Sequence, residues 1–153
     1  MREFNDYEFR GAFMTIFIDI EWLLSDCISM LLVGENELQL DLMEFITPKY
    51  MLDQKVSLLS QILKSRHKDT YNVYKSDLEE LRKFRKLRNN FAHKKIELDN
   101  KNQRLHFLQV LNHRIDKSIN HSFDELNDLW EKLKEILKRM KSLIDEVVRL
   151  KST

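Results

Sequence analysis

The chain contains very few of the residues that interrupt helices. Its 153 residues include only two glycines and one proline, while 42% are hydrophobic and 33% are charged. The abundant Leu, Lys, Glu, Ile and Arg favour helix over sheet, and few breakers are present to end the helices that they form. The length suits one compact domain with its own core. We therefore predict an all-α helical bundle that forms a single domain over residues 1–153.

The chain also has only one cysteine and almost no net charge. The only cysteine, Cys27, lies in an apolar stretch, where a lone thiol is usually a small buried hydrophobe. The net charge is +1, so any attraction to nucleic acid must be local. Two glycines are too few for a phosphate-binding loop. His67, His106, His113 and His121 lack the spacing of a zinc site, so we expect no metal and no cofactor.

The longest apolar stretch is not expected to span a membrane. Residues 11–33 contain Asp19, Glu21 and Asp26, and each acid near a bilayer centre costs about 2.5–3.5 kcal/mol. The first ten residues alternate acids and bases and lead to no small-residue cleavage site, so they do not resemble a signal peptide. We expect a cytoplasmic protein without a membrane partner.

Apolar spacing and breakers divide the chain into four predicted helices and one small hairpin. Gly34 is expected to end the first helix. The apolar residues of segment 36–50 suit a short helix or an extended segment equally well, and Pro48 blocks helix continuation from Thr47, so we interpret this segment as a connection. Ser122 and Glu125 form a capping box at the start of the last helix. The predicted helices cover residues 6–33, 51–66 and 71–93 and a long segment after Ser122, with a possible β-hairpin near residues 95–110.

Two helices carry more apolar residues than one amphipathic face needs. The first helix is apolar nearly all round, so we expect neighbouring helices or a second subunit to cover it. The last helix has a broad stripe of Leu, Ile, Met and Val, which favours core packing over a coiled-coil seam. Trp22 and Trp130 are interpreted as core or interface anchors.

A concentrated basic segment lies near the middle of the chain. No acid stands between Glu80 and Glu97, and the bases there are Arg82, Lys83, Arg85, Lys86, Arg88, Lys94 and Lys95. Such a stripe is suited to phosphate groups. The alternative is a solvated helix face, because cations are also favoured at helix C-termini.

The basic segment ends in "RNNFAH", residues 88–93. At about 100° per residue, Arg88 falls on the apolar side of the helix, where it needs either an acid, such as Asp19 or Glu21, or an anion in a cleft. Asn89 and His93 are four residues apart and therefore share a face beside Arg88. Histidine can exchange a proton near neutral pH, arginine can stabilise the charge of a developing phosphorane, and asparagine can orient either the histidine or the substrate.

The six residues resemble the RNxxAH form of the R-x4–6-H motif of the HEPN superfamily, all-helical domains that include metal-independent ribonucleases of toxin–antitoxin, abortive-infection and CRISPR systems. The resemblance implies catalytic roles for Arg88 and His93 and a supporting role for Asn89, with Ala92 as the small residue before the histidine. It also implies a homodimer in which both protomers supply one cleft. Position 95 is lysine, so regulation through a tyrosine two residues after the histidine is not expected.

These features predict a HEPN-like endoribonuclease that needs no metal and acts as toxin or effector of a prokaryotic defence system. The substrate would be RNA, bound by Arg82, Arg85, Lys86, Lys94 and Lys95, and an antitoxin or other protein partner is possible. One alternative is a non-catalytic module of the same fold that binds nucleotide or protein. Another is a structural oligomerisation domain built on the long last helix.

Overall fold

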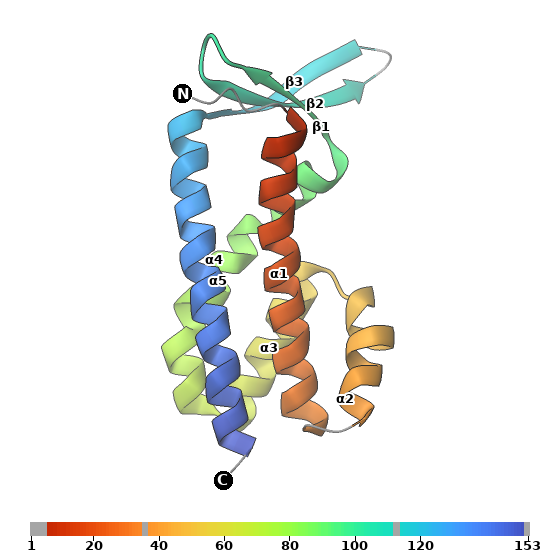
Figure 1. Cartoon of the computed structure of the whole chain (residues 1–153), viewed down its shortest axis with the longest axis vertical. Coiled ribbons are helices and arrows are strands. Elements are labelled where there is room, and N and C mark those ends of the chain that lie inside the picture. Colours follow the sequence, from red (N-terminus) through yellow and green to blue (C-terminus); the bar gives the residue numbers. More distant parts are fainter. Residues whose placement is uncertain (1–5, 35–36, 112–113, 152–153) are drawn as a thin grey trace. The chain divides into compact units, whose positions relative to one another are not determined.

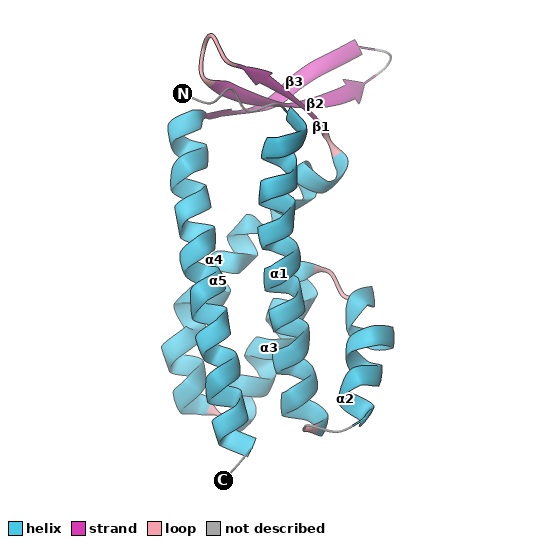
Figure 2. Cartoon of the chain, viewed as in Figure 1, coloured by secondary structure: helices cyan, strands magenta, loops and turns pink. Residues whose placement is uncertain are grey.

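The computed structural model describes residues 6–34, 37–111 and 114–151, and within them the predicted fold class is confirmed. Helices dominate, and one small antiparallel sheet accompanies them (Figures 1 and 2). The elements are α1 (Asp6–Val33), α2 (Glu37–Asp41), the π-helix η1 (Leu42–Ile46), the 3₁₀ helix η2 (Thr47–Lys49), α3 (Leu52–Arg66), α4 (Lys68–His93), β1 (Lys95–Asp99), β2 (Arg104–Leu111), β3 (Arg114–Ser122) and α5 (Phe123–Lys151).

The contacts divide the chain into two compact units. The first combines Met1–Phe17 with Lys86–Lys134, and the second combines Ile18–Arg85 with Glu135–Thr153. Helices α1, α4 and α5 each contribute residues to both units. The expected single domain stays a prediction, and the units are described separately below.

In the first unit, the sheet has the order β1-β2-β3 with antiparallel pairing throughout. The hairpin predicted near residues 95–110 corresponds to β1 and β2. Ile96, Leu105 and Phe107 are buried, as expected for alternate residues of a half-buried sheet. Strand β3 was not predicted, because its sequence RIDKSINHS contains only two apolar residues and gives little hydrophobic alternation.

In the second unit, the prediction that residues 36–50 form a connection is wrong for Glu37–Lys49, because these residues are helical. The Thr47 N–H donates to the Leu42 carbonyl, a π-type bond spanning five residues. In that register the next donor would be Pro48, which has no N–H. The Thr47 hydroxyl donates instead to the Met43 carbonyl at 3.1 Å. A side-chain hydrogen bond thus lets the helix tolerate proline.

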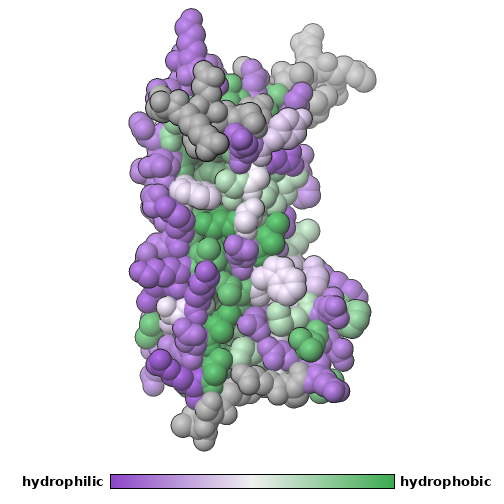
Figure 3. Space-filling view, in the orientation of Figure 1, coloured by the Kyte–Doolittle hydropathy of each residue, from purple (hydrophilic) through white to green (hydrophobic). Residues whose placement is uncertain are grey.

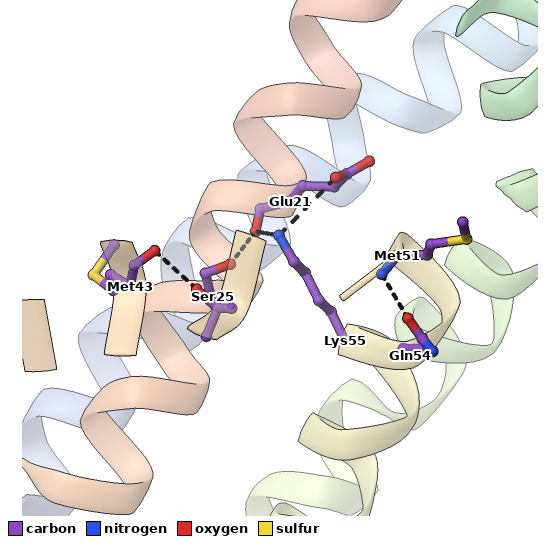
Figure 4. Close-up of polar contacts among 7 residues, drawn as sticks. Glu21, Ser25, Met43, Met51, Gln54 and Lys55 are labelled. Atoms are coloured by element: carbon purple, nitrogen blue, oxygen red, sulfur yellow. Dashed lines mark hydrogen bonds and ion pairs between the residues drawn. The ribbon is translucent and has the colours of Figure 1, made fainter. Parts of the chain in front are cut away.

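Polar contacts in the second unit join α1 to the start of α3 (Figure 4). Lys55 is only 5% exposed, and its Nζ lies 3.3 Å from the Glu21 carbonyl oxygen and 4.0 Å from the Glu21 carboxylate. Ser25 Oγ donates to the same carbonyl at 2.9 Å. The Met51 N–H donates to Gln54 Oε1 at 2.8 Å and caps α3. The Glu21 carboxylate supplies the counter-charge that the buried Lys55 ammonium requires.

The predicted helix boundaries are largely confirmed. Helix α1 ends before Gly34, whose N–H donates to the Met30 carbonyl at 2.9 Å. The capping box at the start of α5 is present, with reciprocal 3.1 Å bonds between Ser122 and Glu125. Helix α4 begins at Lys68, three residues before the predicted start. The core interpretation of the α5 stripe is confirmed for Leu126, Leu133, Ile136, Met140, Leu143 and Val147, which are all buried.

Other expectations for α1 are met only in part. Cys27 is buried, and burial raises the pKa of its thiol far above the usual range, so the thiol stays protonated and behaves as a small hydrophobe. Trp22 is 59% exposed, so it is not a core residue. Figure 3 shows further apolar side chains at the surface among hydrophilic ones. None of the described helices is long and apolar enough to cross a bilayer.

Replacement by alanine should change the stability in opposite directions at Gly11, within α1, and at Gly34, directly after α1. Gly34 has φ +76°, a conformation that costs an L-residue about 1–2 kcal/mol, so Gly34→Ala should lower the melting temperature by a few degrees. Gly11 is an exposed helical residue, so Gly11→Ala should raise stability by about 0.5–1 kcal/mol. Neither added methyl group meets an atom within 4 Å. Thermal unfolding of both variants measures the difference; equal shifts would contradict the assigned helix end.

Candidate functional site

The basic motif forms the C-terminal end of α4, in the first unit. The helix ends at His93, the Lys94 N–H donates to the Asn90 carbonyl at 2.9 Å, and β1 begins at Lys95. Residues 88–93 therefore join a helix directly to the sheet. The prediction that the motif lies at a helix end is confirmed.

Aromatic packing fixes this helix end. Phe91, inside the motif, is fully buried. Its ring centroid lies 4.5 Å from that of Phe13 in α1, in a stacked arrangement, and 5.0 Å from that of Phe107 in β2, in an edge-to-face arrangement. Phe13 also contacts Trp130 in α5 at 5.1 Å, so Trp130 acts as the anchor that the sequence predicted. Such pairs contribute about 0.5–1.5 kcal/mol each beyond their burial.

A hydrogen bond from α1 completes the helix end. Arg10 Nη2 donates to the Ala92 carbonyl oxygen at 2.6 Å. This carbonyl belongs to the last turn of α4, where carbonyl groups lack intrahelical donors. A cation is also favoured there by the helix dipole. Arg10 therefore holds the backbone beside His93 with both a hydrogen bond and a charge, a contact across 82 residues of sequence.

The three predicted catalytic residues differ in exposure. His93 is exposed, whereas Arg88 and Asn89 are half-buried. Among the described residues, His93 has no hydrogen-bond or ion-pair partner, so its imidazole is accessible. Asn90, which the sequence analysis did not single out, is buried, with only 7% of its surface exposed.

The expected acidic partners of Arg88 lie in the other unit. Asp19 is exposed, and Glu21 lies beside Lys55. Arg88 itself takes part in an interaction within the chain and is not an isolated charge. Its half-buried position agrees with the helical phase from which the sequence placed it beside the apolar side.

The basic segment is less positive in three dimensions than in sequence. In the second unit, Arg85 Nη1 lies 3.0 Å from Asp53 Oδ2, and Lys83 Nζ lies 2.6 Å from Glu80 Oε2. The bond to Glu80 raises the pKa of Lys83. Arg82 is exposed in this unit. Asp53 belongs to α3, so the continuous sequence did not reveal that it faces Arg85.

In the first unit, three predicted RNA-binding lysines flank the motif. Lys86 and Lys95 are exposed, and Lys94 is half-buried. Lys94 and Lys95 immediately follow His93, at the junction of α4 and β1. The structure thus brings two lysines and the accessible histidine to one helix end, while Arg82 and Arg85 belong to the other unit.

The remaining histidines have varied surroundings. His67 and His121 are half-buried, and His121 Nδ1 lies 3.6 Å from Glu125 Oε2. His106 is buried in β2, with Nδ1 2.5 Å from Asn120 Oδ1. His113 lies outside the described residues. Within the described ranges, no three His, Cys, Asp or Glu side chains gather as a metal site would require.

Two hollows in the surface were not predicted from the sequence. One, of about 200 Å³ in the second unit, is lined by Trp22, Lys55 and neighbouring apolar residues. The other, of about 330 Å³ in the first unit, is lined by Asp99, Asn102, Arg104 and His106. An Arg-x-His spacing on one strand places both side chains on one face. That alternation was the available signal for the second hollow.

Comparison with known proteins adds no relative: no protein-family model, curated protein or solved structure matches the chain.

Phe91→Ala should destabilise the protein strongly. Removing a buried phenylalanine costs about 3–5 kcal/mol, because the cavity that remains closes only partly. Phe45 is 62% exposed, so Phe45→Ala is a matched control that should stay within about 0.5 kcal/mol of the parent. Denaturant unfolding measures both. Similar losses in the two variants would show that Phe91 does not anchor the helix end.

Proposed function

We propose that the chain is a metal-independent endoribonuclease of the HEPN type, acting in the cytoplasm as toxin or effector of a prokaryotic defence system. The observation that carries this proposal is the RNNFAH motif at the end of α4, with an exposed His93 and a half-buried Arg88. Phe91 and the bond from Arg10 to Ala92 support it, because they hold the last turn of the helix in place. Rigid positioning of catalytic groups is what such chemistry requires.

In the proposed reaction, His93 removes the proton from a ribose 2′-hydroxyl. The 2′-oxygen attacks the adjacent phosphorus, and the bond from phosphorus to the 5′-oxygen breaks. Arg88 stabilises the negative charge that develops on the non-bridging oxygens. Asn89 orients the histidine or the substrate, and the departing 5′-oxygen takes up a proton from solvent water. The products are a 2′,3′-cyclic phosphate and a 5′-hydroxyl.

Lysines around the helix end are proposed to bind the RNA backbone. Lys86, Lys94 and Lys95 share the unit that contains His93, and phosphate contacts of this kind give affinity without sequence preference. Arg82 and Arg85, which belong to the second unit, are also proposed to bind phosphate groups. Because Arg85 already pairs with Asp53, its contribution is expected to be smaller than that of the exposed Lys86 and Lys95.

A homodimer is part of the proposal. Each chain offers one Arg88 and one His93, and a second copy would complete a composite cleft. Ile18, Trp22 and Leu32 of α1 are exposed apolar residues and support association with another surface. An antitoxin that covers the motif is proposed as a further protein partner.

A second candidate function is a non-catalytic module that binds nucleotide or protein. Two observations favour it: Arg85 is neutralised by Asp53, and Arg88 is already engaged within the chain. A binding module would retain affinity for RNA or nucleotide while leaving RNA intact. A cleavage assay therefore separates the two proposals.

His93→Ala should abolish RNA cleavage with little change in stability. Loss of a general base typically lowers the rate about 10²–10⁴-fold, whereas an exposed side chain away from the core contributes within about 0.5 kcal/mol to stability. Arg88→Ala should abolish cleavage as well. Gel analysis of mixed single-stranded RNA and a melting curve for each variant provide the two readouts.

His67→Ala is the matched control for these substitutions, because His67 is a histidine outside the motif, at the junction of α3 and α4. It should cleave RNA at the parental rate. Full cleavage by both the Arg88→Ala and the His93→Ala variant would show that neither residue is catalytic. An intact RNA pool with the parent protein, together with measurable RNA binding, would favour the binding module.

Cleavage should persist in excess EDTA and should leave 2′,3′-cyclic phosphate ends. A histidine and an arginine supply the base and the positive charge that a metal ion provides in metal-dependent nucleases. The ends are identified by mass spectrometry and by their resistance to direct ligation. Products with 3′-hydroxyl ends, or complete loss of activity in EDTA, would contradict the proposed chemistry.

A further inference from the structure

The polar hollow of the first unit is formed by the outer face of the sheet and the turn between β1 and β2. Residues paired across antiparallel strands share a face, so Asp99, Arg104 and Ser122 form one row and Glu97, His106 and Asn120 form the next. Asp99, Asn102, Arg104 and His106 line a hollow of about 330 Å³, called the sheet pocket below. This volume lies at the lower end of the range for small-molecule sites.

His106 is held in one orientation within this pocket. It is only 7% exposed, and Nδ1 lies 2.5 Å from Oδ1 of Asn120 on the neighbouring strand. Because an amide oxygen only accepts, the imidazole donates from Nδ1, and the lone pair of the neutral ring is then on Nε2. The side chain that orients His106 thus determines which ring nitrogen accepts a hydrogen bond.

Because His106 lines the hollow and Asn120 holds Nδ1, Nε2 is the ring nitrogen available to a ligand there. Among the described residues, Ser29 Oγ is the only fully enclosed side-chain polar atom that lacks a hydrogen-bond partner. Nε2 has no partner in the described part of the chain either, so it must be reachable from outside. A ligand that enters the pocket therefore meets a hydrogen-bond acceptor at Nε2.

Arg104 supplies positive charge at the same place. It is exposed, stands two residues before His106 on β2, and has no ion-pair partner in the described ranges. Its guanidinium offers five N–H donors in the fork geometry that suits a phosphate group. Arg104 and the acceptor of His106 together match a ligand with a phosphate and a hydroxyl group.

The turn beside Arg104 is built to stay in place. Asp99 Oδ1 accepts the Asn102 N–H at 3.1 Å, and Asp99 Oδ2 accepts a hydrogen from Asn102 Nδ2 at 2.8 Å. Gln103 takes φ 51°, and its carbonyl accepts the Phe123 N–H at 2.9 Å, at the start of α5. The turn is thereby tied to a long helix, and the Asp99 carboxylate is occupied by donors from Asn102.

We propose that the sheet pocket binds a ribonucleotide, with its phosphate on Arg104 and a ribose hydroxyl donating to Nε2 of His106. The ligand is either a free mononucleotide or a nucleotide within an RNA strand, since both present the same groups. The proposal does not rest on the ribonuclease function, because binding is measurable without cleavage. The pocket residues are separate from Arg88, Asn89 and His93.

Isothermal titration calorimetry on the full chain tests the two contacts with matched ligands. AMP should bind at least about tenfold more tightly than adenosine, which lacks the phosphate, and than 2′,3′-dideoxy-AMP, which lacks both ribose hydroxyls, because each lost contact to a buried or charged partner is typically worth about a tenfold change. Equal affinities for AMP and adenosine would overturn the proposal. Equal affinities for AMP and the dideoxy compound would overturn the role of His106.

Substitutions assign the site. Arg104→Gln removes an exposed side chain, so the fold should be retained, and it should weaken AMP binding about tenfold. Lys101→Gln removes one positive charge from the same turn but outside the pocket, and it should change the affinity less than about twofold. Equal losses in these two variants would indicate general charge attraction and overturn the site.

The Asp99→Asn variant distinguishes a site in which a phosphate lies near Asp99 from a site in which Asp99 contacts the base. It keeps an oxygen that accepts the Asn102 N–H but removes a negative charge, so a phosphate should bind more tightly. Weaker binding of AMP would assign Asp99 to a base and contradict the phosphate contact. Competition by single-stranded RNA, measured in the His93→Ala background to prevent cleavage, distinguishes a strand from a free nucleotide as the ligand.

Discussion

Burial of Phe91 is the constraint on which the geometry of the candidate site depends. A fully buried phenylalanine contributes about 1.5–3 kcal/mol through burial alone, and its stacked and edge contacts add to this. Successive residues of an α-helix are rotated by about 100°, so fixing Phe91 fixes its neighbours. His93 then lies about 200° away and faces outward, while Arg88 lies about 60° away and flanks the buried side. Their different exposures follow from one core residue.

The charges around this helix end show why a linear count overstates a basic surface. Seven bases without an intervening acid predict a strong positive stripe, yet Asp53 of α3 neutralises Arg85, and Glu80, one turn back on α4, bonds Lys83. In the first unit Lys86 and Lys95 are exposed, while Lys94 is half-buried and takes part in an interaction within the chain. A nucleic-acid contact at this place would be local, in keeping with a net charge of +1.

Much of the fold could be predicted because local signals agreed with the final structure. Gly34 ended α1, and the Ser122–Glu125 box began α5, as local backbone chemistry requires. The segment 36–50 could not be predicted, since a hydroxyl of Thr47 compensates for the missing N–H of Pro48 only in a π-type register. Strand β3 forms because its backbone pairs with β2. Its polar sequence gives no hydrophobic pattern from which this pairing could be predicted.

The candidate site, too, could be predicted only in part from the sequence. Motif spacing placed Arg88 and His93 correctly on a helix end, because helical phase is a property of the sequence. The neighbours that orient or neutralise side chains came from distant segments: Arg10 reaches Ala92, Asp53 meets Arg85, and Asn120 holds His106. No periodicity encodes such pairs, since they arise only when separate elements pack.

The discontinuous make-up of both units has a consequence for biosynthesis. The first unit needs residues 1–17 together with 86–134, and the second needs 18–85 together with 135–153. A nascent chain that has just exposed the RNNFAH segment therefore lacks the sheet and α5. The later aromatic partners of Phe13 and Phe91, which are Trp130 and Phe107, have not yet been translated. Closing such long loops is entropically costly and slow. Completion of the motif is thus coupled to synthesis of the segments that follow it, and a ribosome-bound fragment would carry the residues of the site without their geometry.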